Sequence, residues 1–100
     1  MTIDITRQDT SAYCRISGDI DESGAAEMKR RFEQLDLANL QEVVFDLQGV
    51  TYIGSAGLGK LLLFYKKLSM NNAVMRVEHP SSMVRDILIE LRLDSLFPVA

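Results

Sequence analysis

Residues 46–59 of the chain read Asp-Leu-Gln-Gly-Val-Thr-Tyr-Ile-Gly-Ser-Ala-Gly-Leu-Gly. The apolar run that leads into them, Val43-Val44-Phe45, is nearly continuous, as is typical of a central strand covered on both faces. The stretch therefore predicts a strand over 42–47, a short connection over 48–54, and a helix that begins at Ser55. A buried strand that leads directly into a helix indicates an α/β fold.

The same alternation of strand and helix patterns extends in both directions from this stretch. In chain order, the patterns predict strands over 3–7 and 12–17, a helix over 23–35, the strand and helix already described, a strand over 73–78, a helix from Pro80 to Leu91, and a closing turn over 94–97. Strands that alternate with helices need right-handed crossovers, so the sheet should be largely parallel. The opening hairpin of two strands makes it a mixed sheet.

Length and composition limit the class of protein. One hundred residues, of which 47% are hydrophobic, predict a single domain over residues 1–100 with an ordinary core. The lone Cys14 excludes an intrachain disulfide and a cysteine metal cluster, and it fits a cytoplasmic location. A net charge of −3 disfavours nucleic acid as a partner. The polar start of the chain does not resemble a signal peptide, and the longest apolar run, Leu61 to Tyr65, cannot span a membrane.

The turn Gly54-Ser55-Ala56-Gly57 is the strongest candidate for a functional contact. Ser55 is predicted to cap the following helix, because its hydroxyl can accept a hydrogen bond from a free backbone N–H. The glycines let another molecule approach the backbone closely, and the helix N-terminus attracts negative charge. The turn therefore suits either phosphate recognition or contact with a protein partner.

Two enzymatic interpretations of these residues are disfavoured. Residues 54–60 satisfy the G-x-x-x-x-G-K pattern of nucleotide-binding loops, but Leu61 replaces the hydroxyl residue that would hold Mg²⁺. Asp21 and Asp46 are expected to lie near each other, yet no nucleophile or histidine accompanies them. Capping and turn formation are the expected roles of these aspartates. The sequence thus predicts a protein that is not an enzyme and that needs no cofactor or metal.

Leu63 stands apart on the second helix. The apolar stripe of that helix is expected to comprise Leu58, Leu61, Leu62, Tyr65 and Leu68. Leu63 lies outside the stripe, among the lysines Lys60, Lys66 and Lys67. Two interpretations stay open: an isolated exposed leucine, which is common, or an apolar anchor for a partner with a basic rim.

Several motifs together resemble the STAS family, the domain of bacterial anti-sigma-factor antagonists. The family pattern is a strand that ends in Asp-Leu-x-x-Val, followed by Asp-Ser-Ser-Gly-Leu at a helix start. This chain has Asp-Leu-Gln-Gly-Val at 46–50 and Gly-Ser-Ala-Gly-Leu at 54–58. The segments Gly18-Asp19-Ile20-Asp21 and 93–98 also resemble family members. The resemblance implies a mixed sheet of four or five strands with three to four helices packed against it.

The resemblance also implies a mechanism called partner switching. The unmodified antagonist binds an anti-sigma factor, often a serine kinase, which then phosphorylates the serine before the motif glycine and ends the interaction. The residues implied in partner binding are Asp21, Gly54, Ser55, Ala56, Gly57 and Leu58, with Leu63 added by its exposure. The protein is expected to be a monomer or a weak homodimer, without direct membrane insertion.

This chain departs from the family at two positions of the motif. Gly54 replaces the acidic residue, and Ala56 replaces the phospho-acceptor, so phosphorylation at position 56 is chemically impossible. The chain is expected to be a constitutive binder or to have an altered switch, with Ser55 as a less favoured phosphosite. An alternative comes from the STAS accessory subunits of ABC lipid-transport systems, which carry Asp-Thr-Ala-Gly-Leu and resemble residues 55–58 in having a hydroxyl residue before alanine.

Overall fold

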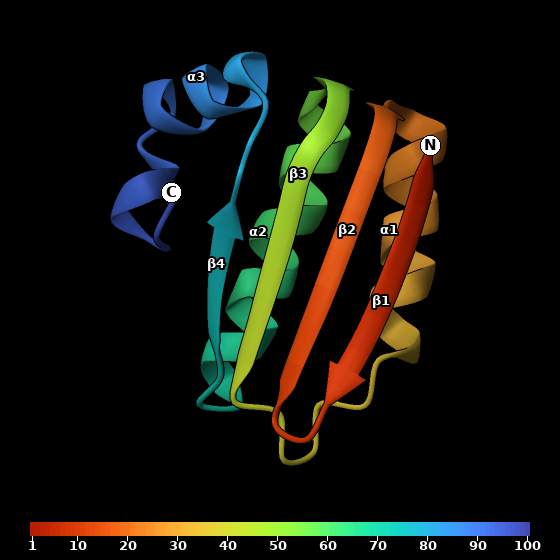
Figure 1. Ribbon diagram of the computed structural model, residues 1–100, viewed down its shortest axis with the longest axis vertical. Coiled ribbons are helices and arrows are strands. Elements are labelled where there is room, and N and C mark those ends of the chain that lie inside the picture. Colours follow the sequence, from red (N-terminus) through yellow and green to blue (C-terminus); the bar gives the residue numbers. More distant parts are fainter.

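The computed structural model describes all 100 residues and has an α/β architecture. Its elements are, in chain order, β1 (Thr2–Gln8), β2 (Ser11–Ile20), α1 (Glu22–Gln34), β3 (Glu42–Ile53), α2 (Ser55–Met70), β4 (Val74–Glu78), α3 (Ser82–Glu90) and the 3₁₀-helix η1 (Leu93–Ser95). The four strands form one sheet in the order β1-β2-β3-β4 (Figure 1). β1 is antiparallel to β2, whereas β2, β3 and β4 are mutually parallel. The predicted fold class, element order and mixed sheet are confirmed.

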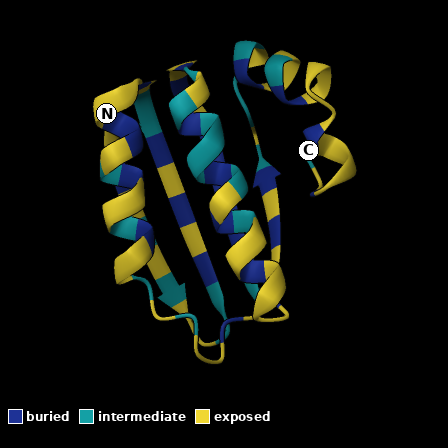
Figure 2. Cartoon of the chain, turned by 180° about the vertical axis from the view of Figure 1, so that it is seen from behind, coloured by how far each residue is buried: buried dark blue, intermediate teal, exposed yellow.

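The sheet has one covered face and one open face. α1 and α2 lie side by side behind the sheet in Figure 1, and no helix crosses its front. Seen from behind, the buried residues of both helices lie on the sides turned toward the strands (Figure 2). α3 lies beyond the end of β4, the chain then turns back beside the end of that strand, and Val99 forms a parallel bridge with Val77. Phe97, in this returning segment, is buried.

Three phenylalanines form the centre of the core between the helices and the sheet. The rings of Phe32 and Phe64 are stacked with their centroids 4.4 Å apart, and Phe45 meets both rings edge-on. The predicted apolar stripe of α2 was wrong in this respect: it omitted the buried Phe64 and included three residues that are only half-buried, Leu58, Leu62 and Tyr65. The centre of the buried face of α2 is thus turned toward α1 and Phe32.

β3 is longer than the sequence indicated, because it continues to Ile53 instead of ending at residue 47. The extra residues pair with an equally extended β2, which runs through Gly18 to Ile20. Two register shifts accompany this pairing, and Gly18 has a φ of +91°, a conformation that glycine adopts readily. β2 therefore continues through Gly18, with a local irregularity in its pairing, instead of ending before it. β2 and β3 end side by side, at Ile20 and Ile53.

Cys14 is a core residue. Its side chain faces the helices from β2 and is 2% exposed. Burial raises the pKa of the thiol from its usual 9.0 to about 12, with a smaller opposing effect from Arg31. Because the thiolate is the reactive form, the folded protein keeps Cys14 unreactive near neutral pH. No helix of the chain combines the length and the apolar character needed to cross a membrane.

Candidate functional site

The predicted contact turn lies where β2 and β3 end together. The backbone N–H of Gly54 donates to the carbonyl of Ile20 across 3.0 Å, which places the start of α2 beside the start of α1. A surface hollow of about 220 Å³ opens at this point. We call it the loop site; its lining residues are Asp21, Glu22, Tyr52, Gly54, Ser55 and Ala56. Asp21 and the turn, which are 33 residues apart in the chain, are thus brought together.

The two helices that border the loop site begin in different ways. Asp21 caps α1, since its Oδ1 accepts from the N–H of Gly24 at 2.9 Å. Ser55 does not cap α2, which corrects the prediction. The cap is Gly54, whose extended backbone precedes the first turn and whose carbonyl accepts from the N–H of Leu58. Ser55 is the first helical residue, and its exposed hydroxyl makes no hydrogen bond within the chain.

The glycines at the start of α2 differ in how closely other residues approach them. A Cβ atom at Gly57 would lie 2.5 Å from Cγ2 of Ile20, so this glycine allows α2 to pack tightly against the end of β2. A Cβ atom at Gly59 would meet nothing within 4 Å. At Gly54, a Cβ atom would lie 3.0 Å from Oη of Tyr52. The phenol of Tyr52 therefore lies close to the space that a side chain at position 54 would occupy.

The charge of the loop site disfavours an anionic ligand. Its lining includes the carboxylates of Asp21 and Glu22 and no basic side chain. These carboxylates oppose the attraction that the N-termini of two helices would otherwise exert on an anion. Lys60, the lysine of the nucleotide-loop pattern, instead lines a groove between α1 and α2. The arrangement suits a partner that presents hydrogen-bond donors or positive charge, and it does not support the phosphate-recognition alternative.

Asp46 is not part of this site, contrary to expectation. It lies in the middle of β3, seven residues before Ile53, which corresponds to about 20 Å of extended chain. Asp46 is 5% exposed on the open face of the sheet, where its carboxylate accepts from the N–H of Gln48 at 3.0 Å and lies 3.5 Å from Nε of Arg15. Both predictions for Asp46, a turn-forming role and proximity to Asp21, are therefore wrong, because Asp46 lies within β3, and its bond to Gln48 coincides with a register shift between β2 and β3.

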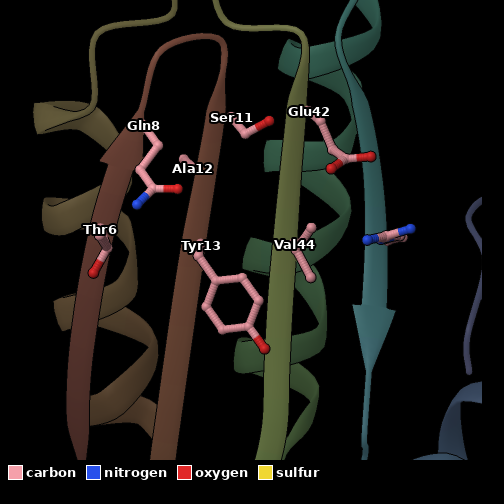
Figure 3. Close-up of a pocket in the computed structure, with 8 residues that line it drawn as sticks. Thr6, Gln8, Ser11, Ala12, Tyr13, Glu42 and Val44 are labelled. Carbon is pink, nitrogen blue, oxygen red and sulfur yellow. The ribbon is translucent and has the colours of Figure 1, made fainter.

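The largest hollow in the surface is elsewhere, on the open face of the sheet. It measures about 380 Å³ and contains none of the predicted site residues (Figure 3). Val44 lies at its floor, and the ring of Tyr13 leans from β2 toward β3. Burial, followed by the charges of Asp46 and Glu78, raises the pKa of Tyr13. Arg76, which also lines the hollow, is paired with Glu78 at 2.9 Å, so its charge is already neutralised.

Leu63 lies outside the loop site but on the same helix. Its side chain is 55% exposed and borders the groove between α1 and α2. Sequence reasoning missed two residues of the loop site, Tyr52 and Glu22. The sequence pattern predicts a loop at Tyr52, because the apolar run of β3 ends at residue 47. Tyr52 is instead 50% exposed at the end of the strand, a position that depends on the pairing of β3 with β2. Glu22 could have been inferred from its position next to Asp21.

Solved structures share the fold of this chain. An anti-sigma factor antagonist from Mycobacterium paratuberculosis is 26% identical, with a TM-score of 0.85 over 98% of this chain and 83% of that one. The phosphorylated Bacillus cell fate determinant SpoIIAA is 13% identical, with a TM-score of 0.78 over 99% and 91% of the two chains. A STAS domain protein from Planctomyces limnophilus is 20% identical, with a TM-score of 0.75 over 98% and 87%.

The sequence itself carries the family assignment. The family model described as the STAS domain matches residues 2–100, which is nearly the whole chain and includes the loop site and both helices that border it. The sequence match and the fold agree, and the chain belongs to the STAS domain family.

Proposed function

We propose that this protein is an anti-sigma-factor antagonist that binds its anti-sigma factor through the loop site. The observation that carries the proposal is the meeting of Asp21 with the turn from Gly54 to Ala56 at one exposed end of the fold, within a chain matched over residues 2–100 by the STAS family. The resemblance described above assigns partner binding to these residues. The similar Mycobacterium paratuberculosis structure is of an anti-sigma factor antagonist.

The proposed antagonist binds constitutively, because Ala56 has no oxygen that could accept a phosphate. Ser55 is not equivalent to a serine at 56, since adjacent residues of a helix point about 100° apart. A phosphate at position 56 would add about −1.5 to −2 charges next to the carboxylates of Asp21 and Glu22. In a family member with the usual serine, the bulky phosphate would displace a partner fitted to the unmodified surface, and its charge would be costly to desolvate beside these carboxylates. This chain lacks that means of release.

The binding proposal is tested by isothermal titration of the purified protein with each anti-sigma factor and serine-kinase-like ATPase of the source organism. We expect one of these proteins to bind with 1:1 stoichiometry and a dissociation constant of about 1 µM or lower, equivalent to about −8 kcal/mol. Absence of binding to every such protein would contradict the proposal.

A STAS accessory subunit of an ABC lipid-transport system is the second candidate function. The observation in its favour is the order of a hydroxyl residue and an alanine at Ser55 and Ala56, which resembles those subunits. The same titration separates the two candidates when the ABC ATPases of the organism are included. Binding to an ABC ATPase, together with no binding to an anti-sigma factor, would favour the transport function.

A further inference from the structure

The lysines of this acidic protein are concentrated on two helices. The net charge is −3, yet all four lysines, at positions 29, 60, 66 and 67, are on α1 and α2. Three of them line a shallow groove of about 60 Å³ between these helices. We call it the helix groove; its lining residues are Lys29, Phe32, Lys60, Leu63, Phe64 and Lys67.

The helix groove combines an apolar centre with a basic rim. Phe32 and Phe64 form its floor and are almost fully buried, whereas Leu63 stands 55% exposed beside them. Lys60 and Lys67 form no ion pair with any carboxylate of the chain. Lys29 has one weak neighbour, Glu33, at 4.0 Å, and both side chains are largely exposed. The groove therefore presents positive charge that the protein itself does not neutralise.

The helix groove lies further along α2 than the loop site. Ala56, Lys60, Leu63 and Lys67 follow the spacing i, i+4, i+7 and i+11, so they share one face of α2. Leu63 lies seven residues beyond Ala56, which corresponds to about 10 Å along the helix axis. One partner can therefore contact the loop site and the groove together. From the loop site to the groove, the surface changes from acidic, at Asp21 and Glu22 of the start of α1, to basic.

We propose that the helix groove holds an acidic amphipathic helix of the same anti-sigma factor that binds the loop site. An apolar side chain of that helix packs against Leu63, and carboxylates on either side of it lie opposite Lys60 and Lys67. This inference rests on the proposed function and adds the second contact of its partner. A protein fits better than an anionic membrane, because the carboxylates of Asp21 and Glu22 at the adjoining loop site would be repelled by acidic lipid headgroups.

Paired variants of neighbouring residues test the inference. We expect Lys67→Glu to weaken binding of the anti-sigma factor identified by titration about 10-fold, because it opposes the partner's carboxylates. Lys66→Glu makes the same charge change about 100° around the helix and should change the affinity less than twofold. Leu63→Ala should weaken binding about 10-fold or more, whereas Met70→Ala, at the exposed end of α2, should have no effect. Circular dichroism verifies that each variant is folded.

The outcomes distinguish this inference from the proposed function. If the wild-type protein binds the anti-sigma factor and Lys67→Glu and Leu63→Ala bind equally well, the helix groove is not a contact, although the antagonist function stands. Failure of the wild-type protein to bind contradicts both. Co-sedimentation with vesicles of phosphatidylcholine and phosphatidylglycerol tests the membrane alternative. If Lys67→Glu abolishes this co-sedimentation and leaves binding of the anti-sigma factor unchanged, the groove is a membrane contact and the inference is overturned.

Discussion

Replacement of Phe64 by alanine should lower the free energy of unfolding by about 3–5 kcal/mol, which is a large part of the stability of a domain of this size. Phe64 is 3% exposed, stacks on Phe32 at 4.4 Å and meets Phe45 at 6.0 Å. Truncation removes both aromatic contacts and leaves a cavity between two helices and a sheet that cannot easily close. Urea denaturation followed by circular dichroism measures the loss.

The matched control is the neighbouring residue. Leu63→Ala removes a side chain that is more than half exposed, so its free energy of unfolding should change by about 0.5 kcal/mol or less. We therefore expect different defects in the two variants: Phe64→Ala loses stability, whereas Leu63→Ala loses affinity for the partner. Equal stability losses in the two variants would show that the buried face of α2 is assigned incorrectly.

Introduction of an aspartate at Ala56 should weaken binding of the anti-sigma factor about 100-fold or more. The new carboxylate would lie in the loop site beside Asp21 and Glu22, at the surface that the partner is proposed to contact. The larger side chain would displace a partner fitted to alanine, and its charge would have to be desolvated at the interface beside two other carboxylates. Each 1.4 kcal/mol of this cost corresponds to a tenfold change in affinity. Folding should be little affected, because a carboxylate in the first turn of a helix is favourable. Isothermal titration measures the affinity.

The control for this variant is Ala38→Asp, which makes the same chemical change on an exposed loop at the opposite end of the strands. It should bind the anti-sigma factor as the wild-type protein does. Unchanged affinity in Ala56→Asp would mean that the partner contacts another surface. An equal loss in both variants would indicate a general effect of negative charge rather than a local contact.

The order of the elements could be predicted from the sequence because each one has a clear local pattern. The Val43-Val44-Phe45 run indicated a buried central strand, and the polar turns between the first two strands indicated a hairpin. The full length of β3 could not be predicted, since Gln48, Gly49, Thr51 and Tyr52 are exposed and carry no continuous apolar pattern. Their strand conformation depends on pairing with β2, which is a tertiary interaction.

The candidate site was predicted only in part, because its details also depend on tertiary interactions. The motif located the turn and Asp21, but the roles of the individual residues depended on backbone detail. Ser55 was an obvious capping residue by type, yet the helix begins one residue earlier than such a cap requires, and Gly54 takes the position. The helix groove is formed by residues of two helices, including Lys29 of α1 and Lys67 of α2. It could not be predicted, because no pattern along one helix shows that α1 lies beside α2.

The central claim is that the loop site binds an anti-sigma factor and that Ala56 prevents release by phosphorylation. The most direct measurement is the affinity of the wild-type protein for its anti-sigma kinase before and after incubation with that kinase, Mg²⁺ and ATP, with mass spectrometry of the product. We predict no added phosphate and an affinity that stays within twofold, whereas Ala56→Ser gains a phosphate and then loses binding. A wild-type protein that becomes stoichiometrically phosphorylated at Ser55 and releases the kinase would contradict the claim.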